Sequence, residues 1–283
     1  MPSEIPYRGR IAPSPTGLLH LGHARTFWTA QERARAAGGK LILRVEDLDF
    51  ARCKSEFVQA MYEDLRWFGF KWDEGPDIGG PFAPYVQSQR KDFYRAAFQK
   101  LHEVGAIYPC VCSRQDVLRA FSAPHIGEEE PVYPGTCRAL SLSQITKDKK
   151  ISWRFRVPEG ENISFEDKNF DLQNFVAGKD FGDFVVWRHD DVPSYQLAVV
   201  VDDAAMQITE VVRGADLLLS TARQILLYRA LKWVEPKFFH SPLITDEKGA
   251  RLAKRHDALS LRALRTNGSK PESLRENAAP PTC

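Results

Sequence analysis

Strand-like and helix-like segments alternate along this chain. Alternate positions are apolar over residues 40–45, which predicts a strand, and apolar residues recur at helical spacing over residues 55–68, before Gly69. The same patterns predict helices at residues 22–37, 89–104 and 217–231, and strands at residues 151–157, 181–188 and 207–212. Asp216 is expected to cap the last of these helices. The alternation predicts an α/β fold built on a parallel sheet.

A turn near the N-terminus joins the first strand to the first helix. Residues 10–26 read RIAPSPTGLLHLGHART, in which two prolines exclude helix from the turn and a glycine gives backbone freedom after it. The helix N-terminus favours an anion by roughly 0.3 to 1 kcal/mol, and His20 and His23 flank Gly22 there. This order of parts predicts a phosphate-binding corner. A structural loop whose histidines cap the helix is the alternative.

Charged residues stand at the ends of two predicted strands. Glu46 follows the strand at 40–45, and Arg213 lies where the strand at 207–212 meets a helix. Ligands of open α/β sheets bind beyond the carboxyl ends of the strands, so Ala12 to Ser14 and Glu46 are expected to face one crevice. For Glu46, a structural ion pair with Arg44 or Arg52 is the alternative.

Composition narrows the class of protein. At 283 residues and 43% hydrophobic, the chain can bury a core large enough for one large domain or two modest ones. The N-terminus lacks the apolar run of a secretory signal, and no apolar stretch is long enough to cross a bilayer, so a soluble cytoplasmic protein is expected. A net charge of +2 permits an RNA partner without requiring one. Walker A and G-x-G-x-x-G patterns are absent, which argues against P-loop ATPases and dinucleotide enzymes.

Three of the five cysteines form a sequence cluster. Cys110, Cys112 and Cys137 supply soft ligands that favour zinc over magnesium, and a closed tetrahedral site needs a fourth group. Chemistry alone selects His125 as that group. Three reduced thiols without a metal are the alternative, because Cys-x-Cys is weaker evidence than paired Cys-x-x-Cys motifs. A closed site of this kind would be structural.

The corner segment resembles the signature of the glutamyl-tRNA synthetase group of class I aminoacyl-tRNA synthetases. The string RxAPSPTGxLHLGHxRT carries the resemblance, and HLGH stands in the place of the HIGH motif. The segment RLAKR at residues 251–255 is similar to the KMSKS-type loop, with Arg251 and Ala253 as departures and Lys254 in the place of the phosphate-contacting lysine. The resemblance implies a Rossmann-like parallel sheet with an inserted, zinc-containing, acceptor-binding-like subdomain.

This resemblance implies ATP-dependent activation of glutamate, with Mg²⁺ accompanying ATP. The catalytic and ATP-binding residues would be His20, Gly22, His23 and Lys254. Glutamate would contact Arg10, Ala12, Ser14, Glu46, Tyr195 and Arg213. Charge supports part of this set, because Glu46 can accept from the α-ammonium, and the guanidinium groups of Arg10 and Arg213 match a carboxylate. Without the resemblance Tyr195 would be interpreted as core. The resemblance also replaces His125 with Tyr133 as the fourth zinc ligand.

The expected organisation is a catalytic domain split by the insert. Its first half covers residues 1–105, the insert residues 106–190, the second half residues 191–265, and a flexible tail residues 266–283. Only 28 residues follow Arg255, so we expect the chain to lack the anticodon-binding region of a full glutamyl-tRNA synthetase. In this the chain is similar to the glutamyl-queuosine tRNA(Asp) synthetase family.

That family resemblance implies transfer of glutamate to queuosine in the anticodon of tRNA(Asp), by a monomer. Two other functions remain open. One is a truncated glutamyl-tRNA synthetase core that charges a tRNA 3′ end. The other is a non-catalytic synthetase paralogue that binds RNA.

Overall fold

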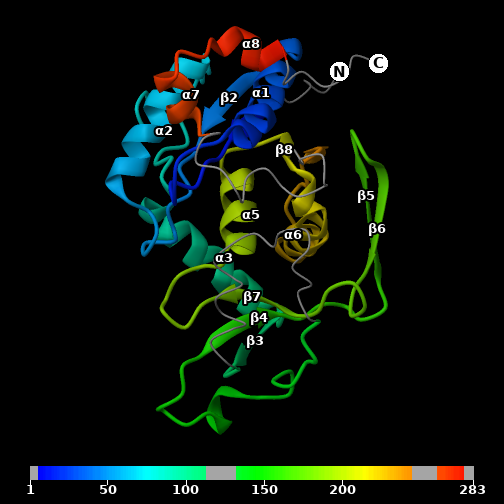
Figure 1. Cartoon of the computed structure of the whole chain (residues 1–283). Coiled ribbons are helices and arrows are strands. Elements are labelled where there is room, and N and C mark those ends of the chain that lie inside the picture. The colour runs from blue at the N-terminus through cyan, green and yellow to red at the C-terminus, as the bar shows by residue number, and fades with distance from the viewer. Residues whose placement is uncertain (1–5, 113–131, 244–259, 277–283) are drawn as a thin grey trace. The chain divides into compact units, whose positions relative to one another are not determined.

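The computed structural model describes residues 6–112, 132–243 and 260–276 (Figure 1). The chain divides into two compact units. The first consists of Met1–Gln89, Ile208–Ala215 and Pro236–Cys283, and the second of Arg90–Gln207 and Asp216–Glu235. Each unit therefore joins stretches that are far apart in the sequence.

The first unit is built on short parallel strands with helices. Its strands are β1 (Arg8–Ile11), β2 (Lys40–Leu43), β8 (Glu210–Gly214) and β9 (Lys237–Ser241), and its helices are α1 (Leu21–Ala36), α2 (Ser55–Phe68), α7 (Leu261–Thr266) and α8 (Pro271–Glu276). Strand β1 pairs in parallel with β2, and β8 in parallel with β9. The Thr209 amide donates to the Arg8 carbonyl and so joins the end of β1 to the chain before β8. The parallel pairs confirm the expected α/β class.

Helix α2 shows how the apolar pattern becomes packing. Met61, Leu65 and Phe68 are buried in one apolar core together with Ile11 of β1 and Val212 of β8. The helix ends where Gly69 adopts a left-handed conformation, with φ 96°, and its amide donates to the carbonyls of the last turn. The bounds of α2 are those expected from the sequence.

Part of the expected C-terminal tail is helical. Helix α8 lies within the stretch from residue 266 onward that was expected to be flexible. The guanidinium of Arg275 donates to the Phe68 carbonyl at the end of α2 and lies 4.7 Å from the centre of the Trp28 ring. These contacts hold the short helix against the first unit, and residues 277–283 lie outside the described part.

The second unit combines helices with antiparallel strands. Its helices are α3 (Lys91–Glu103), α5 (Tyr195–Ala205) and α6 (Leu218–Leu231), and its strands are β3 (Ile107–Cys110), β4 (Ser152–Phe155), β5 (Asn162–Asp167), β6 (Asp171–Val176) and β7 (Phe184–Trp187). Strand β4 lies between β3 and β7, and β5 and β6 form a hairpin that Figure 1 draws as a long two-stranded ribbon.

A buried ion pair ties the helices of the second unit together. Nε of Arg90 donates to the Asp202 carboxylate at 2.6 Å, and both side chains are fully buried. The Tyr94 hydroxyl donates to the same carboxylate. This network fixes α3 against α5, the helix that begins at Tyr195.

Two further expectations differ from the structure. The hairpin of β5 and β6 was not expected. Asp216 does not cap α6, because it lies in a short 3₁₀ helix, Ala215–Leu217, and the N-cap residue is Leu217, whose side chain makes no capping hydrogen bond. The division at residues 105, 190 and 265 stays a prediction. The compact units are divided differently, because they place α3, α5 and α6 in the same unit as strands β3 to β7.

Candidate functional site

The two histidines of the corner cap helix α1. Nδ1 of His20 accepts the Gly22 amide at 3.1 Å, and Nδ1 of His23 accepts the His20 amide at 3.4 Å. The two rings stack with their centres 3.7 Å apart. A ring whose Nδ1 accepts a hydrogen bond carries its proton on Nε2 when it is neutral. The capping alternative is therefore present in the structure.

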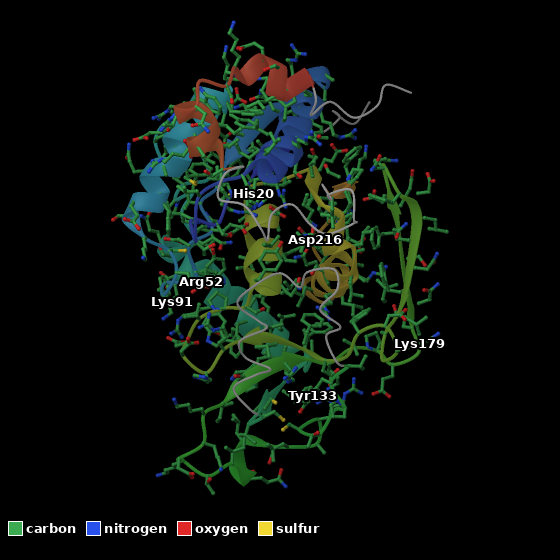
Figure 2. All side chains as sticks on the ribbon, in the orientation of Figure 1. His20, Arg52, Lys91, Tyr133, Lys179 and Asp216 are labelled. Carbon is green, nitrogen blue, oxygen red and sulfur yellow. The ribbon has the colours of Figure 1, made fainter. Side chains whose placement is uncertain are left out.

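The corner is also joined to the chain that follows the KMSKS-like segment. Ser260 pairs with His20 in an antiparallel bridge, and the Leu261 amide donates to the Leu19 carbonyl at 2.7 Å. The Ser260 hydroxyl caps α7 by accepting the Ala263 amide. The first described residues after the segment are thus fixed at the histidine corner, which Figure 2 marks at His20.

Glu46 lies beside the same corner. Its amide donates to the Pro13 carbonyl at 3.0 Å, so the chain around Ala12 to Ser14 is adjacent to the end of β2. Arg44 donates to Oε1 of Glu46 at 2.9 Å, and both side chains are buried. Arg52 pairs with Asp49. The structural ion pair considered for Glu46 is therefore present, and Arg44 is its partner.

Strand β8 brings two arginines together. Nη1 of Arg10 donates to the Val212 carbonyl at 2.9 Å, next to Arg213 in the chain. Nε of Arg213 donates to Nε2 of His240 at 3.2 Å, because the parallel register of β8 and β9 places these residues opposite each other. The side chains of Arg10, Arg213 and His240 are all buried. The site thus holds two buried guanidinium groups, whose charge and shape match a carboxylate.

Tyr195 belongs to the second unit, where it is the first residue of α5. It is half-buried, and the preceding Ser194 caps the helix by accepting the Leu197 amide. The capped start of α5 therefore fixes the backbone position of Tyr195.

The three cysteines of the second unit form one cluster with Tyr133. The Sγ atoms of Cys110, Cys112 and Cys137 all lie within 4.8 Å of one another. Oη of Tyr133 lies 3.5 Å from Sγ of Cys110 and 3.1 Å from Sγ of Cys112, and Figure 2 labels Tyr133 beside the yellow sulfur atoms. In tetrahedral zinc sites the bond lengths imply sulfur–sulfur distances of about 3.8 Å and oxygen–sulfur distances of about 3.5 Å. The cluster fits a Cys₃Tyr zinc site.

Hydrogen bonds prepare part of this cluster for ionisation. Burial opposes ionisation of the Cys137 thiol, but hydrogen bonds from Tyr133 and from the Val111 amide outweigh it and lower its pKa. For Cys112, burial dominates and raises the pKa to about 12. The thiol of Cys137 is therefore easier to ionise than that of Cys112, and the thiolate is the form that binds metal.

Two residues of these sites carry no signal in the sequence. His240 was not expected beside Arg213, and Arg154 was not expected beside the cysteines. Each reaches its site through strand register: His240 opposite Arg213, and Arg154 on β4 opposite Tyr108 of β3. Lys254, Arg251, Ala253 and His125 lie outside the described residues.

Comparison with known proteins identifies the family to which the chain belongs. Residues 7–279 match the family model of the tRNA synthetases class I (E and Q), catalytic domain. The chain belongs to this family of class I synthetases. A glutamate tRNA ligase from Elizabethkingia meningosepticum, solved in complex with its amino acid, superposes with a TM-score of 0.75 at 31% identity, over 93% of this chain and 53% of that chain.

Two curated relatives narrow the class further. The glutamyl-Q tRNA(Asp) synthetase of Symbiobacterium thermophilum is 51% identical over 271 residues, which cover 94% of this chain and 83% of that protein. The glutamyl-Q tRNA(Asp) synthetase of Nitratidesulfovibrio vulgaris is 48% identical over 265 residues, covering 92% and 82%. Within the class I family, the chain belongs with the glutamyl-Q tRNA(Asp) synthetases. None of the described helices is long and apolar enough to span a membrane.

Proposed function

We propose that this chain activates L-glutamate with ATP and transfers the glutamyl group to queuosine in tRNA(Asp). In the first step a glutamate carboxylate oxygen attacks the α-phosphorus of ATP, the bond to the β-phosphate oxygen breaks, and pyrophosphate leaves. In the second step a nucleophile of the acceptor attacks the glutamyl carbonyl carbon and displaces AMP. The similarity to glutamyl-Q tRNA(Asp) synthetases across most of both chains carries the choice of acceptor.

The histidine corner supports the first step. Each imidazole accepts a backbone N–H through Nδ1, so Nε2–H is the donor that a phosphate oxygen would meet, next to Gly22. Such donors would stabilise the charge that accumulates as pyrophosphate leaves. Lys254 would add a mobile ammonium, and Mg²⁺ bound with ATP would screen the phosphates.

The arginines and Glu46 support selection of glutamate. Arg10 and Arg213, buried at β1 and β8, would hold the side-chain carboxylate. Glu46 would accept from the α-ammonium, and Ala12 and Ser14 would contact the same ligand. The family resemblance adds Tyr195 to the residues that bind glutamate. The pair with Arg44 would then orient the Glu46 carboxylate. A ligand that lacks a second carboxylate could not make these hydrogen bonds to the two arginines, which disfavours it.

The cysteine cluster is proposed to hold one structural zinc ion, with Cys110, Cys112, Cys137 and Tyr133 as its ligands. Zinc would link β3 to the loop that carries Tyr133 and Cys137, and four protein ligands would leave no position for substrate.

The acceptor is tested with radiolabelled glutamate and tRNA from cells with and without queuosine. Labelling of the queuosine-containing tRNA alone is expected, and it should persist with tRNA whose 3′-terminal adenosine has been removed. Labelling that is lost with this shortened tRNA would favour charging of the 3′ end. Absence of glutamate-dependent exchange between ATP and pyrophosphate would favour a non-catalytic RNA-binding protein.

A further inference from the structure

Arg154 lies against the cysteine cluster. Its Nε atom donates to Sγ of Cys110 at 3.3 Å, and its guanidinium carbon lies 3.8 Å from the centre of the Tyr133 ring. Its Nη1 atom donates to the Asp183 carbonyl at 2.8 Å. The side chain is 4% exposed. One buried cation therefore contacts two members of the candidate metal site.

Charge explains why such a cation matters there. Three thiolates around Zn²⁺ leave a net charge of −1 if Tyr133 is a neutral ligand, and −2 if it binds as a phenolate. Burying that excess charge is costly unless a cation lies nearby, and a guanidinium over an aromatic face also interacts favourably with the ring. The Cys112 amide adds a weaker compensation, since it points at Sγ of Cys110 from 3.5 Å.

The guanidinium is held in place independently of the metal. Its bond to the Asp183 carbonyl fixes one end, and the register of β4 with β3 places Arg154 opposite Tyr108. The Asp183 carboxylate has donors of its own in Arg138, Tyr108 and the Val157 amide. Removing the Arg154 charge therefore leaves the carboxylate network beside the cluster intact.

We infer that Arg154 is a positioning residue of the zinc site, whose charge stabilises the thiolate-rich centre and whose contacts orient Cys110 and Tyr133. This inference rests on the proposed zinc site. Outer residues that orient metal ligands typically alter metal affinity by about 10- to 100-fold when they are replaced. Arg154 is expected to act in that range.

The test compares zinc affinities of the full chain by competition with a chromophoric chelator. Arg154→Met, which preserves length but removes charge, should bind zinc about 10- to 100-fold more weakly than the wild type. Arg154→Lys should recover part of the lost affinity. Arg156→Met is the control, because the described contacts of the Arg156 side chain are with the Tyr108 ring, at 4.8 Å, and with the Arg138 carbonyl, and none is with a cysteine sulfur. The control should bind zinc as the wild type does.

The outcomes distinguish failure of the proposed zinc site from failure of the role of Arg154. A wild-type protein that binds no zinc overturns the metal site and the role of Arg154 together. If the wild type binds zinc, equal affinity in Arg154→Met, or no recovery in Arg154→Lys, overturns the role of Arg154 alone. Should Arg154→Met not fold, Arg154→Gln replaces it with the same expected loss. Cobalt substitution gives a second measure, since an altered tetrahedral absorption band in Arg154→Met would report displaced ligands directly.

Discussion

Replacing His240 should weaken the use of glutamate more than the use of ATP. His240 contacts Arg213 through a 3.2 Å hydrogen bond between paired strands, and it is fully buried. His240→Leu removes the acceptor and leaves the guanidinium without the bond that orients it. If Arg213 holds the glutamate side chain as proposed, its orientation is part of the specificity of the site.

The size of the effect follows from that one bond. A hydrogen bond to a charged group contributes about 1.5 to 3 kcal/mol, and about 1.4 kcal/mol corresponds to a factor of ten. If this energy serves to orient Arg213, His240→Leu should raise the KM for glutamate about 10- to 150-fold. His240→Gln retains an acceptor oxygen, so it should stay closer to the wild type.

Exchange between ATP and pyrophosphate measures both substrates in one assay. The KM for ATP is the internal control, because His240 lies on β9 opposite Arg213 and has no proposed role toward the phosphates. Thermal unfolding of each variant checks that the protein is folded. A folded His240→Leu variant with the wild-type KM for glutamate would refute the positioning role, as would equal increases in both KM values.

Three further predictions concern stability. Arg90→Met leaves the buried Asp202 carboxylate without its cation and should cost about 3 to 5 kcal/mol in denaturant unfolding; an unchanged midpoint would contradict this. Burial alone would raise the pKa of Glu210, but the hydrogen bond from Arg33 and the other contacts of this carboxylate outweigh burial and lower the pKa. The stability that the ionised carboxylate adds is therefore present above its unfolded pKa and is lost as the pH falls through its folded pKa. Glu210→Gln should therefore be less stable than the wild type at pH 7, and the gap in melting temperature should close on acidification. Burial raises the pKa of Asp64, so its ionisation costs stability as pH rises; Asp64→Asn should gain stability over the wild type at pH 8 and none near pH 4, and the reverse trend would count against it.

Local patterns predicted the elements that carry their own signals. Helix α2 has apolar residues at helical spacing and a glycine stop, so its observed bounds, Ser55–Phe68, could be predicted. The hairpin of β5 and β6 could not be predicted, because its turn has neither glycine nor proline and Asp171 takes the left-handed conformation there. Helix α8 could not be predicted, because a six-residue helix depends on tertiary contacts such as those of Arg275.

The residues of the candidate site also fall into those that the sequence could predict and those that it could not. Motif residues such as His20 and Glu46 could be selected because their types, spacing and family resemblance occur within short stretches of sequence. Arg154 and His240 could not, since strand pairing brings each to its partner from 44 and 27 residues away. Register is decided by packing of the whole sheet, which a single sequence does not display.

The discontinuous first unit has a consequence for folding during synthesis. The Tyr7 hydroxyl donates to Glu210 across 203 residues of chain, and the Thr209 amide donates to the Arg8 carbonyl. At 5–20 residues per second, the ribosome takes roughly 10 to 40 s to make the intervening chain. The buried side of β1 must wait that long for its neighbour, whereas the second unit begins only at residue 90 and ends at residue 235, so its parts are made closer together in time. During synthesis the apolar residues of β1 and α1 therefore stay without part of their final packing until β8 is made, and such transiently exposed apolar surface favours aggregation.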